Sequence, residues 1–129
     1  TSVRDVNFPD TMDTNAGIMN RGIIVSRYGG ARGKIGTTEA TADCLYRLKA
    51  ITKMLNIKLE LFKVDLGGGG TDGVDISNQL GCMCYDIGPG VLNMHTWFEV
   101  MGIGDLYSTF SIINAFSKEQ SNERIGMLK

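Results

Sequence analysis

Short apolar runs alternate along this sequence with segments in which apolar residues recur every three or four positions. The first pattern is typical of strands and the second of amphipathic helices. The predicted strands are 22–28, 57–65 and 82–88, and the predicted helices are 38–56, 71–80 and 105–116. Strands that alternate with helices at these intervals predict an α/β fold, in which helices layer against a sheet. A chain of 129 residues is expected to form one domain.

Composition narrows the classes of partner. The formal net charge is −1, and aromatic residues are not interleaved with Lys or Arg, so we expect no nucleic acid and no anionic membrane as partner. No run of about 18 apolar residues is present, so no membrane span is predicted. Cys44, Cys82 and Cys84 do not make a disulfide framework, and we expect buried free thiols in a reducing, cytoplasmic compartment.

Two of the predicted helices have an apolar face that we expect to be buried. The first helix starts after an N-cap at Thr37 or Thr38, and its apolar face consists of Leu45, Leu48, Ile51 and Leu55. The last helix is predicted from about Asp105 to Phe116, and its apolar face consists of Leu106, Phe110 and Ile113. The polar residues from 117 to 129 are expected to form a frayed tail.

Four consecutive glycines, Gly67 to Gly70, lead directly into Thr71. A flexible linker is one interpretation, but the run joins a predicted strand to a predicted helix rather than two domains. A phosphate-binding loop is a second, but no Lys follows the glycines as such a loop requires. The third is a turn whose bare backbone lets a ligand or another main chain approach closely, at the end of a sheet where α/β proteins bind ligands.

His95 is the only histidine in the chain. A lone histidine is more often structural or exposed than a metal ligand. This one, however, follows a predicted strand and a loop with Gly88, Pro89 and Gly90, and Glu99 lies four residues further on. A neutral imidazole at a strand end is a good zinc ligand, and a nearby carboxylate commonly orients such a ring. His95 is therefore a candidate metal ligand.

Four stretches carry a family resemblance: "NRGIIVSRYGGARGK", "TTEATAD", "VDLGGGGTDG" and "DIGPGVLNMHTWFEV". In this order and spacing, from about Asn7 to Phe116, they resemble the aspartyl aminopeptidase and vacuolar aminopeptidase I family of dizinc metallo-aminopeptidases. The resemblance implies a mixed β-sheet layered between helices, of the zinc-peptidase (phosphorylase/hydrolase-like) type. It also implies a hydrolase that removes N-terminal residues from peptides.

The resemblance further implies that residues 1–129 are the C-terminal portion of a catalytic domain. The rest of that domain and an inserted dimerisation domain would then be absent, so we expect this chain to be inactive alone. Its implied partners are a peptide substrate, its own N-terminal catalytic segment and further copies in a homo-oligomer. Of the ligands that hold two zinc ions in the family, only one histidine falls here, at His95; Asp5 matches a position that is not a ligand.

Further roles are implied by the same resemblance. Gly69, Gly70 and Thr71 would line the substrate cleft with Met94, which precedes the histidine. Arg27 matches a position that contacts an acidic substrate side chain in relatives, although a solvated residue at a strand end is an equal interpretation. Asp72 departs from the usual apolar residue, and either caps the following helix or reaches the cleft. The alternative function is a non-catalytic oligomerisation or scaffold module derived from the same fold.

Overall fold

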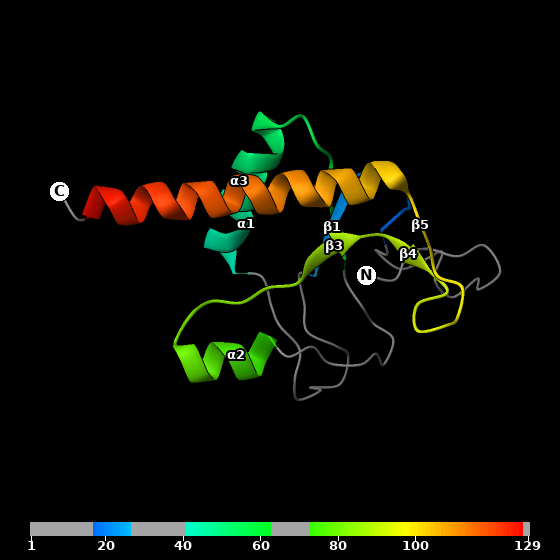
Figure 1. Cartoon of the computed structure of the whole chain (residues 1–129), viewed down its shortest axis with the longest axis horizontal. Coiled ribbons are helices and arrows are strands. Elements are labelled where there is room, and N and C mark those ends of the chain that lie inside the picture. The colour runs from blue at the N-terminus through cyan, green and yellow to red at the C-terminus, as the bar shows by residue number, and fades with distance from the viewer. Residues whose placement is uncertain (1–16, 27–40, 63–72, 128–129) are drawn as a thin grey trace.

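The computed structural model describes residues 17–26, 41–62 and 73–127, and these form a mixed α/β arrangement (Figure 1). The elements in chain order are β1 (Ile23–Ser26), α1 (Ala42–Met54), β2 (Leu59–Phe62), α2 (Gly73–Leu80), β3 (Ile87–Pro89), β4 (Val91–Leu92), β5 (Val100–Met101) and α3 (Ile103–Met127). The predicted α/β class is therefore confirmed. The predicted ends that fall on 27–28, 63–65 and 71–72 lie outside the described residues.

Strand β1 is the centre of a three-stranded sheet with the order β2-β1-β3. It runs parallel to β2, with Ile23 opposite Leu59, and antiparallel to β3, with Ile23 opposite Pro89. The sheet is mixed, as expected. Strands β4 and β5 form a separate antiparallel pair.

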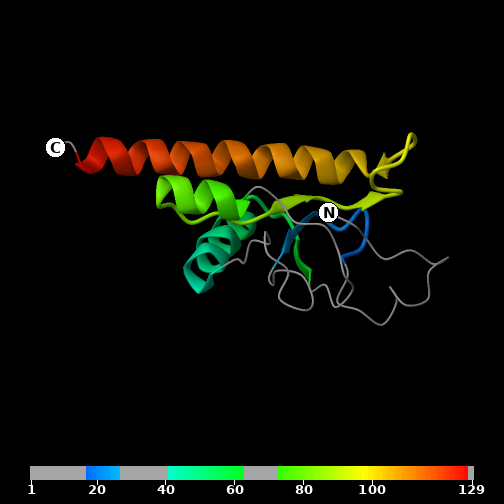
Figure 2. The ribbon, with the colours of Figure 1, turned by 90° about the horizontal axis from the view of Figure 1, so that it is seen from below.

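One face of β1 carries the hydrophobic core. Ile23 and Val25 point to this face because side chains alternate along a strand, and both are fully buried. They pack with Leu48 and Ile51 of α1 and with Ile112 of α3 in a single cluster. Helix α3 lies lengthwise over the strands (Figure 2), so the core joins the sheet to both helices on the same face.

Helix α1 confirms its predicted face but not its predicted start. Leu48 and Ile51 are buried, and Leu45 and Leu55 pack against the cluster. The helix begins at Ala42, after the N-cap Thr41, whose hydroxyl accepts a hydrogen bond from the Cys44 main-chain N–H at 3.4 Å. The predicted N-cap at Thr37 or Thr38 is therefore wrong, because Thr41 caps the helix and accepts a hydrogen bond from a free N–H group of the first turn.

Helix α3 contradicts the sequence-based expectation for its buried face. Its predicted buried residues are exposed: Leu106 by 51%, Phe110 by 65% and Ile113 by 51%. The side that faces the sheet carries instead Asp105, Thr109 and Ile112, all buried. The helix also continues to Met127, so the expected frayed tail after residue 116 is wrong.

The segment before β3 is also different from the prediction. Only Ile87–Pro89 form a strand, whereas residues 82–86 have no regular structure and the predicted strand at 82–88 is wrong there. Of the thiols expected to be buried, Cys44 is buried, Cys84 is half-buried and Cys82 is exposed. The Cys82 and Cys84 sulfur atoms lie 3.8 Å apart, within reach of a thiol hydrogen bond, and form no disulfide. Gly81, predicted to end α2, does so with a left-handed φ of 62°.

Candidate functional site

The candidate metal ligand lies in the turn of the β4–β5 hairpin. Val91 pairs with Met101 and Leu92 with Val100, so residues 93–99 form the connection between the two strands. Both strands have two residues, which makes the hairpin short and its turn long. His95 is exposed in the middle of this turn, which is a place from which an imidazole can reach a ligand outside the hairpin.

Hydrogen bonds fix the main chain of the turn. Asn93 and His95 have left-handed φ values of 56° and 68°, which are uncommon for residues other than glycine. The Thr96 N–H donates to the Asn93 carbonyl oxygen at 3.1 Å, and the His95 N–H donates to Glu99 Oε1 at 2.6 Å. Glu99 therefore holds the main chain at His95. We expected a nearby carboxylate to orient the ring, and Glu99 Oε1 is used on the backbone instead.

Two aromatic side chains next to His95 are in solvent. Trp97 is 97% exposed and Phe98 is 82% exposed, although aromatic side chains contribute more to stability by burial than most others. Their main chain is ordered within the turn, because the Phe98 N–H donates to Thr96 Oγ1 at 3.3 Å. The described residues thus form the turn but leave its apolar side chains without a protein neighbour that buries them.

The other predicted site residues divide into two groups. Met94 lies beside His95 in the turn and is partly buried. Arg27, Gly69, Gly70 and Thr71 lie outside the described residues, so their predicted roles stay predictions, as does the role of Asp72.

A zinc ion needs more ligands than this hairpin provides. Catalytic zinc sites use three protein ligands and structural sites four. Within the described part of the chain, no group of three or more His, Cys, Asp or Glu side chains could hold a metal ion. Among the described residues, His95 can supply one imidazole to a zinc ion. The remaining ligands of such a site would have to come from other residues.

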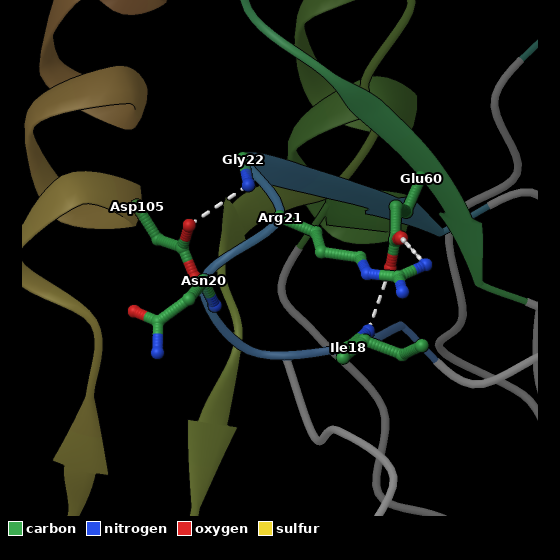
Figure 3. Close-up of polar contacts among 6 residues, drawn as sticks. All are labelled: Ile18, Asn20, Arg21, Gly22, Glu60 and Asp105. Carbon is green, nitrogen blue, oxygen red and sulfur yellow. Dashed lines mark hydrogen bonds and ion pairs between the residues drawn. The ribbon is translucent and has the colours of Figure 1, made fainter.

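A buried carboxylate that sequence reasoning missed fixes the base of the hairpin. Asp105, in the first turn of α3, is only 2% exposed. Its Oδ2 accepts a hydrogen bond from the Asn20 N–H at 2.6 Å and its Oδ1 accepts one from the Gly22 N–H at 2.8 Å (Figure 3). Buried carboxylates need such donors to offset the loss of water. Asp105 thus ties α3 to the turn that leads into β1.

The same turn is held on its other side by Glu60 of β2. Glu60 Oε2 accepts a hydrogen bond from the Ile18 N–H at 2.6 Å, and its Oε1 lies 3.9 Å from Arg21 Nη1 (Figure 3). Gly22 is required here, because its φ is +99° and a Cβ atom would collide with the Lys58 carbonyl oxygen. The turn is therefore clamped between two carboxylates, one from the sheet and one from α3.

Only Gly102 separates β5 from α3, and it lies against the same turn. A Cβ atom on Gly102 would collide with the Asn20 side-chain oxygen. The hairpin with His95 therefore starts from a point that is fixed to β1 through Asp105. A signal for this role was present: Asp105 is the only charged residue between 103 and 116. From the sequence, Asp105 indicates the start of a helix, and the structure shows that it is also a buried anchor.

Comparison with known proteins identifies the family. A family profile described as "Aminopeptidase I zinc metalloprotease (M18)" matches residues 4–117, which include the hairpin and the apolar part of α3. The chain belongs to the M18 aminopeptidase family. The resemblance inferred from the sequence is thereby confirmed, and the family description supports zinc as its metal.

Several M18 aminopeptidases are similar over most of this chain. A probable M18 family aminopeptidase 1 of Clostridium acetobutylicum is 34% identical over 116 residues, which are 87% of this chain and 25% of the relative. That of Thermotoga neapolitana is 34% identical over 108 residues, which are 81% of this chain and 24% of the relative. The chain thus spans about a quarter of the length of the curated relatives it matches.

Solved M18 structures share the fold. The crystal structure of aminopeptidase I from Clostridium acetobutylicum has a TM-score of 0.78 at 31% identity, over 90% of this chain and 26% of that one. The aminopeptidase of Thermotoga maritima has a TM-score of 0.70 at 30% identity, over 86% and 25%. A Saccharomyces aminopeptidase 1 dodecamer, with a TM-score of 0.72 at 20% identity over 92% and 25%, shows the fold alone.

Among the described helices, none is both long and apolar enough to span a bilayer.

Proposed function

We propose that this chain is the C-terminal part of the catalytic domain of a zinc-dependent aminopeptidase, which hydrolyses N-terminal residues from peptides. Membership of the M18 zinc metalloprotease family supports the reaction class. One observation supports a role for this chain in metal binding: His95 is exposed on a turn, and Glu99 fixes the main chain of that turn. An imidazole in this position is available to a metal that other parts of the protein help to bind.

In this proposal His95 contributes its neutral imidazole to one of two zinc ions. When bound, zinc supplies an activated water and polarises the scissile carbonyl. Glu99 keeps the left-handed turn in place, so that the imidazole is presented without a search among backbone conformations. Asp105 fixes the base of the hairpin to the sheet and acts as a positioning residue.

The remaining site residues bind substrate in this proposal. Gly69, Gly70 and Thr71 line the cleft and offer main-chain N–H groups to the peptide, and Met94 lies beside the metal ligand. Arg27 pairs with an acidic side chain of the substrate, because a guanidinium can bind a carboxylate through two hydrogen bonds. Residues 1–129 alone are inactive, because one ligand does not hold two zinc ions.

The environment and assembly of the protein are part of the same proposal. We place it in the cytoplasm, since its cysteines are free thiols in the described structure. We also propose a homo-oligomer, with the dodecameric Saccharomyces relative as support from a shared fold.

A non-catalytic scaffold is the second candidate. The lack of any three-ligand group within the described residues is compatible with a scaffold, as it is with an enzyme whose other ligands lie upstream. The two candidates differ in what the upstream part of the catalytic domain supplies. An upstream part with the remaining His, Asp and Glu ligands favours the enzyme, and its absence or the loss of those ligands favours the scaffold.

The test uses the complete polypeptide, in which this chain is continuous with the upstream part of an M18 catalytic domain. His95→Asn is the informative variant, because Asn tolerates the left-handed φ of 68° while the imidazole is removed. Hydrolysis of aminoacyl p-nitroanilides should fall by more than the roughly 10- to 100-fold typical of changes beyond the direct ligands. Bound zinc, measured by mass spectrometry, should fall with it.

The matched control is Lys53→Ala, an exposed change on α1, which should leave hydrolysis and zinc content unaltered. Comparing acidic with neutral aminoacyl substrates tests Arg27 in the same assay. Near-normal turnover and zinc content in His95→Asn would remove His95 from the metal site. A complete polypeptide that binds no zinc and hydrolyses none of the substrates would favour the scaffold.

A further inference from the structure

Helix α3 has an apolar stripe on the side that faces away from the sheet. We call this stripe the outer face of α3, and it consists of Ile103, Leu106, Tyr107, Phe110 and Ile113. Their spacing of three or four residues places them along one side of the helix. All are substantially exposed, up to 85% at Ile103. Contiguous exposed apolar surface of this kind marks an interaction site.

The opposite side of α3 already packs on the sheet. Ile112 is fully buried in the core cluster, and Ala115 and Phe116 pack against the same cluster. The helix is therefore apolar on two opposite sides between residues 103 and 116. An apolar stripe on a helix of a globular protein normally faces other protein rather than solvent. The outer face is thus expected to have a permanent partner.

The composition of the outer face also favours a permanent partner over a transient one. The only charged residue between 103 and 116 is Asp105, which is buried on the inner side. Permanent interfaces are more apolar than transient ones, and their centres are depleted in charge. Val100 and Met101 of β5, which are also partly exposed, extend the apolar surface towards the hairpin that carries His95.

The extent of the outer face indicates which partner covers it. The stripe ends at Ile113, and the match to the M18 family ends at residue 117. Beyond this point the sequence "KEQSNER", from 118 to 124, is polar and charged. The apolar surface therefore coincides with the part of α3 that the family shares. Its partner is accordingly part of the shared architecture, and relatives contain about three quarters of their length outside the matched region.

We propose that the outer face of α3 is the docking surface for the upstream part of the M18 catalytic domain. This proposal rests on the proposed function, since it takes the chain as one part of such a domain. It also gives docking a consequence for the site. Asp105, Asn20 and Gly102 connect the start of α3 to β1 and to the base of the hairpin. A partner that docks on α3 therefore also fixes its position relative to His95.

Hydroxyl-radical labelling with mass spectrometry tests which molecule covers the outer face. Labelling of Leu106, Tyr107 and Phe110 should be several-fold lower in the complete polypeptide than in the 129-residue chain, at every protein concentration. Equal labelling in the two proteins would overturn the proposal. Protection in the 129-residue chain alone that increases with concentration would also overturn it, because a second copy would then be the partner.

A set of variants of the complete polypeptide gives a second readout. Phe110→Asp introduces a charge into the docking surface and should raise labelling of the outer face several-fold and lower zinc content. Phe110→Leu keeps the side chain apolar and should restore both. Lys118→Glu, exposed on the same helix but beyond the family match, is the control and should change neither. Unchanged labelling and zinc content in Phe110→Asp would contradict the proposal.

Separate measurements distinguish a folding defect in Phe110→Asp, failure of the docking proposal and failure of the proposed enzymatic function. Phe110→Asp should not change the urea midpoint of the 129-residue chain, because Phe110 is exposed there and is not part of the core cluster. A protected outer face in a complete polypeptide without zinc or hydrolysis would retain the docking proposal and reject the enzyme. Hydrolysis by a complete polypeptide whose outer face is fully labelled would retain the enzyme and reject the docking proposal.

Discussion

In a soluble protein, a helix usually buries its apolar side and exposes its polar side. The two sides of α3 are arranged differently. The inner side carries a carboxylate and a hydroxyl, Asp105 and Thr109, and both are buried. The outer face carries only apolar and aromatic side chains, and it is exposed. The difference teaches that an apolar stripe indicates a buried surface but not the partner that buries it. The inner side is used within this chain because its polar groups have partners there.

Those partners make the inner side a specific contact. The Asp105 carboxylate accepts hydrogen bonds from two main-chain N–H groups, and the Thr109 hydroxyl donates to the Asp105 carbonyl oxygen at 2.8 Å. Ile112 completes the contact by filling the core next to Ile23 and Val25. Tyr107, through its phenol hydroxyl, is the one outer-face residue with a directional group, so this face relies mainly on shape and apolar area.

The largest expected effect is that of removing the inner-side carboxylate. Asp105→Ala removes the acceptor of the Asn20 and Gly22 N–H groups, and hydrogen bonds to a charged group contribute about 1.5–3 kcal/mol each. Urea unfolding of the 129-residue chain should therefore show a loss of about 3–5 kcal/mol. Asp105→Asn retains one carbonyl acceptor and should lose less. A loss below about 1 kcal/mol in Asp105→Ala would show that the inner side is not specific.

Adjacent isoleucines give the most direct comparison of the two sides. Ile112 is fully buried and Ile113 is 51% exposed, so the same substitution tests both sides at nearly the same place in the helix. Ile112→Ala should reduce the free energy of unfolding of the 129-residue chain by about 2–5 kcal/mol. Ile113→Ala should change it by about 0.5 kcal/mol or less. Similar losses for the two would mean that the outer face is already covered in this chain.

In the complete polypeptide the same pair sharpens the comparison further. If the outer face is a docking surface, Ile113→Ala should become destabilising there, while the loss in Ile112→Ala should persist. Thermal unfolding of both variants in both proteins measures the change. An Ile113→Ala variant that remains neutral in the complete polypeptide would count against docking at this residue.

The smallest expected effect is a change of stability with pH, which arises from Tyr85, a residue that packs against the inner side of α3 at Phe116. Tyr85 packs edge-on against Phe116 with ring centroids 6.4 Å apart. Burial raises the pKa of Tyr85 above its ordinary value of 10.0, and the Cys44 and Glu119 charges add to the rise, while Arg47 opposes it. The folded chain thus holds the phenol proton more tightly than the unfolded chain. This contribution to stability is complete below the ordinary pKa and is lost as pH rises through the folded-state pKa.

Urea unfolding at increasing alkaline pH measures this contribution, with Tyr85→Phe as the matched variant. The wild-type chain should lose stability more steeply above its ordinary tyrosine pKa than Tyr85→Phe does, because the variant has no phenol proton to lose. Parallel pH profiles for the two chains would show that the Tyr85 phenol contributes nothing.

Much of the fold was predictable from local patterns. The apolar face of α1 and the strands β1 and β2 were predicted because their residues pack as their periodicity indicates. The segment before β3 was not, because the apolar run at 82–86 looks like a strand but pairs with no described neighbour. The last helix was predicted to end at Phe116 but continues to Met127, because the polar run from 117 to 124 carries no apolar period that would mark a helix.

The sequence indicated His95 as a candidate metal ligand, and this role stays a prediction; the residues that hold its turn in place were not predicted. His95 was identified from its residue type and its place after a strand, and it lies on an exposed turn. The β4–β5 hairpin was not predicted, because strands of two residues carry too short a pattern to recognise. The Asp105 anchor was not predicted either, because its hydrogen-bond donors lie 83 and 85 residues away in the sequence.

The sequence by itself determined the α/β class, the family and the candidate metal ligand, because these depend on local periodicity and on motifs in a fixed order. Only the tertiary structure decided which side of α3 packs on the sheet and what holds the hairpin in place. The physical reason is that burial of a helix face depends on which groups meet it. Asp105 is buried because two distant N–H groups satisfy it, and no local pattern records their position.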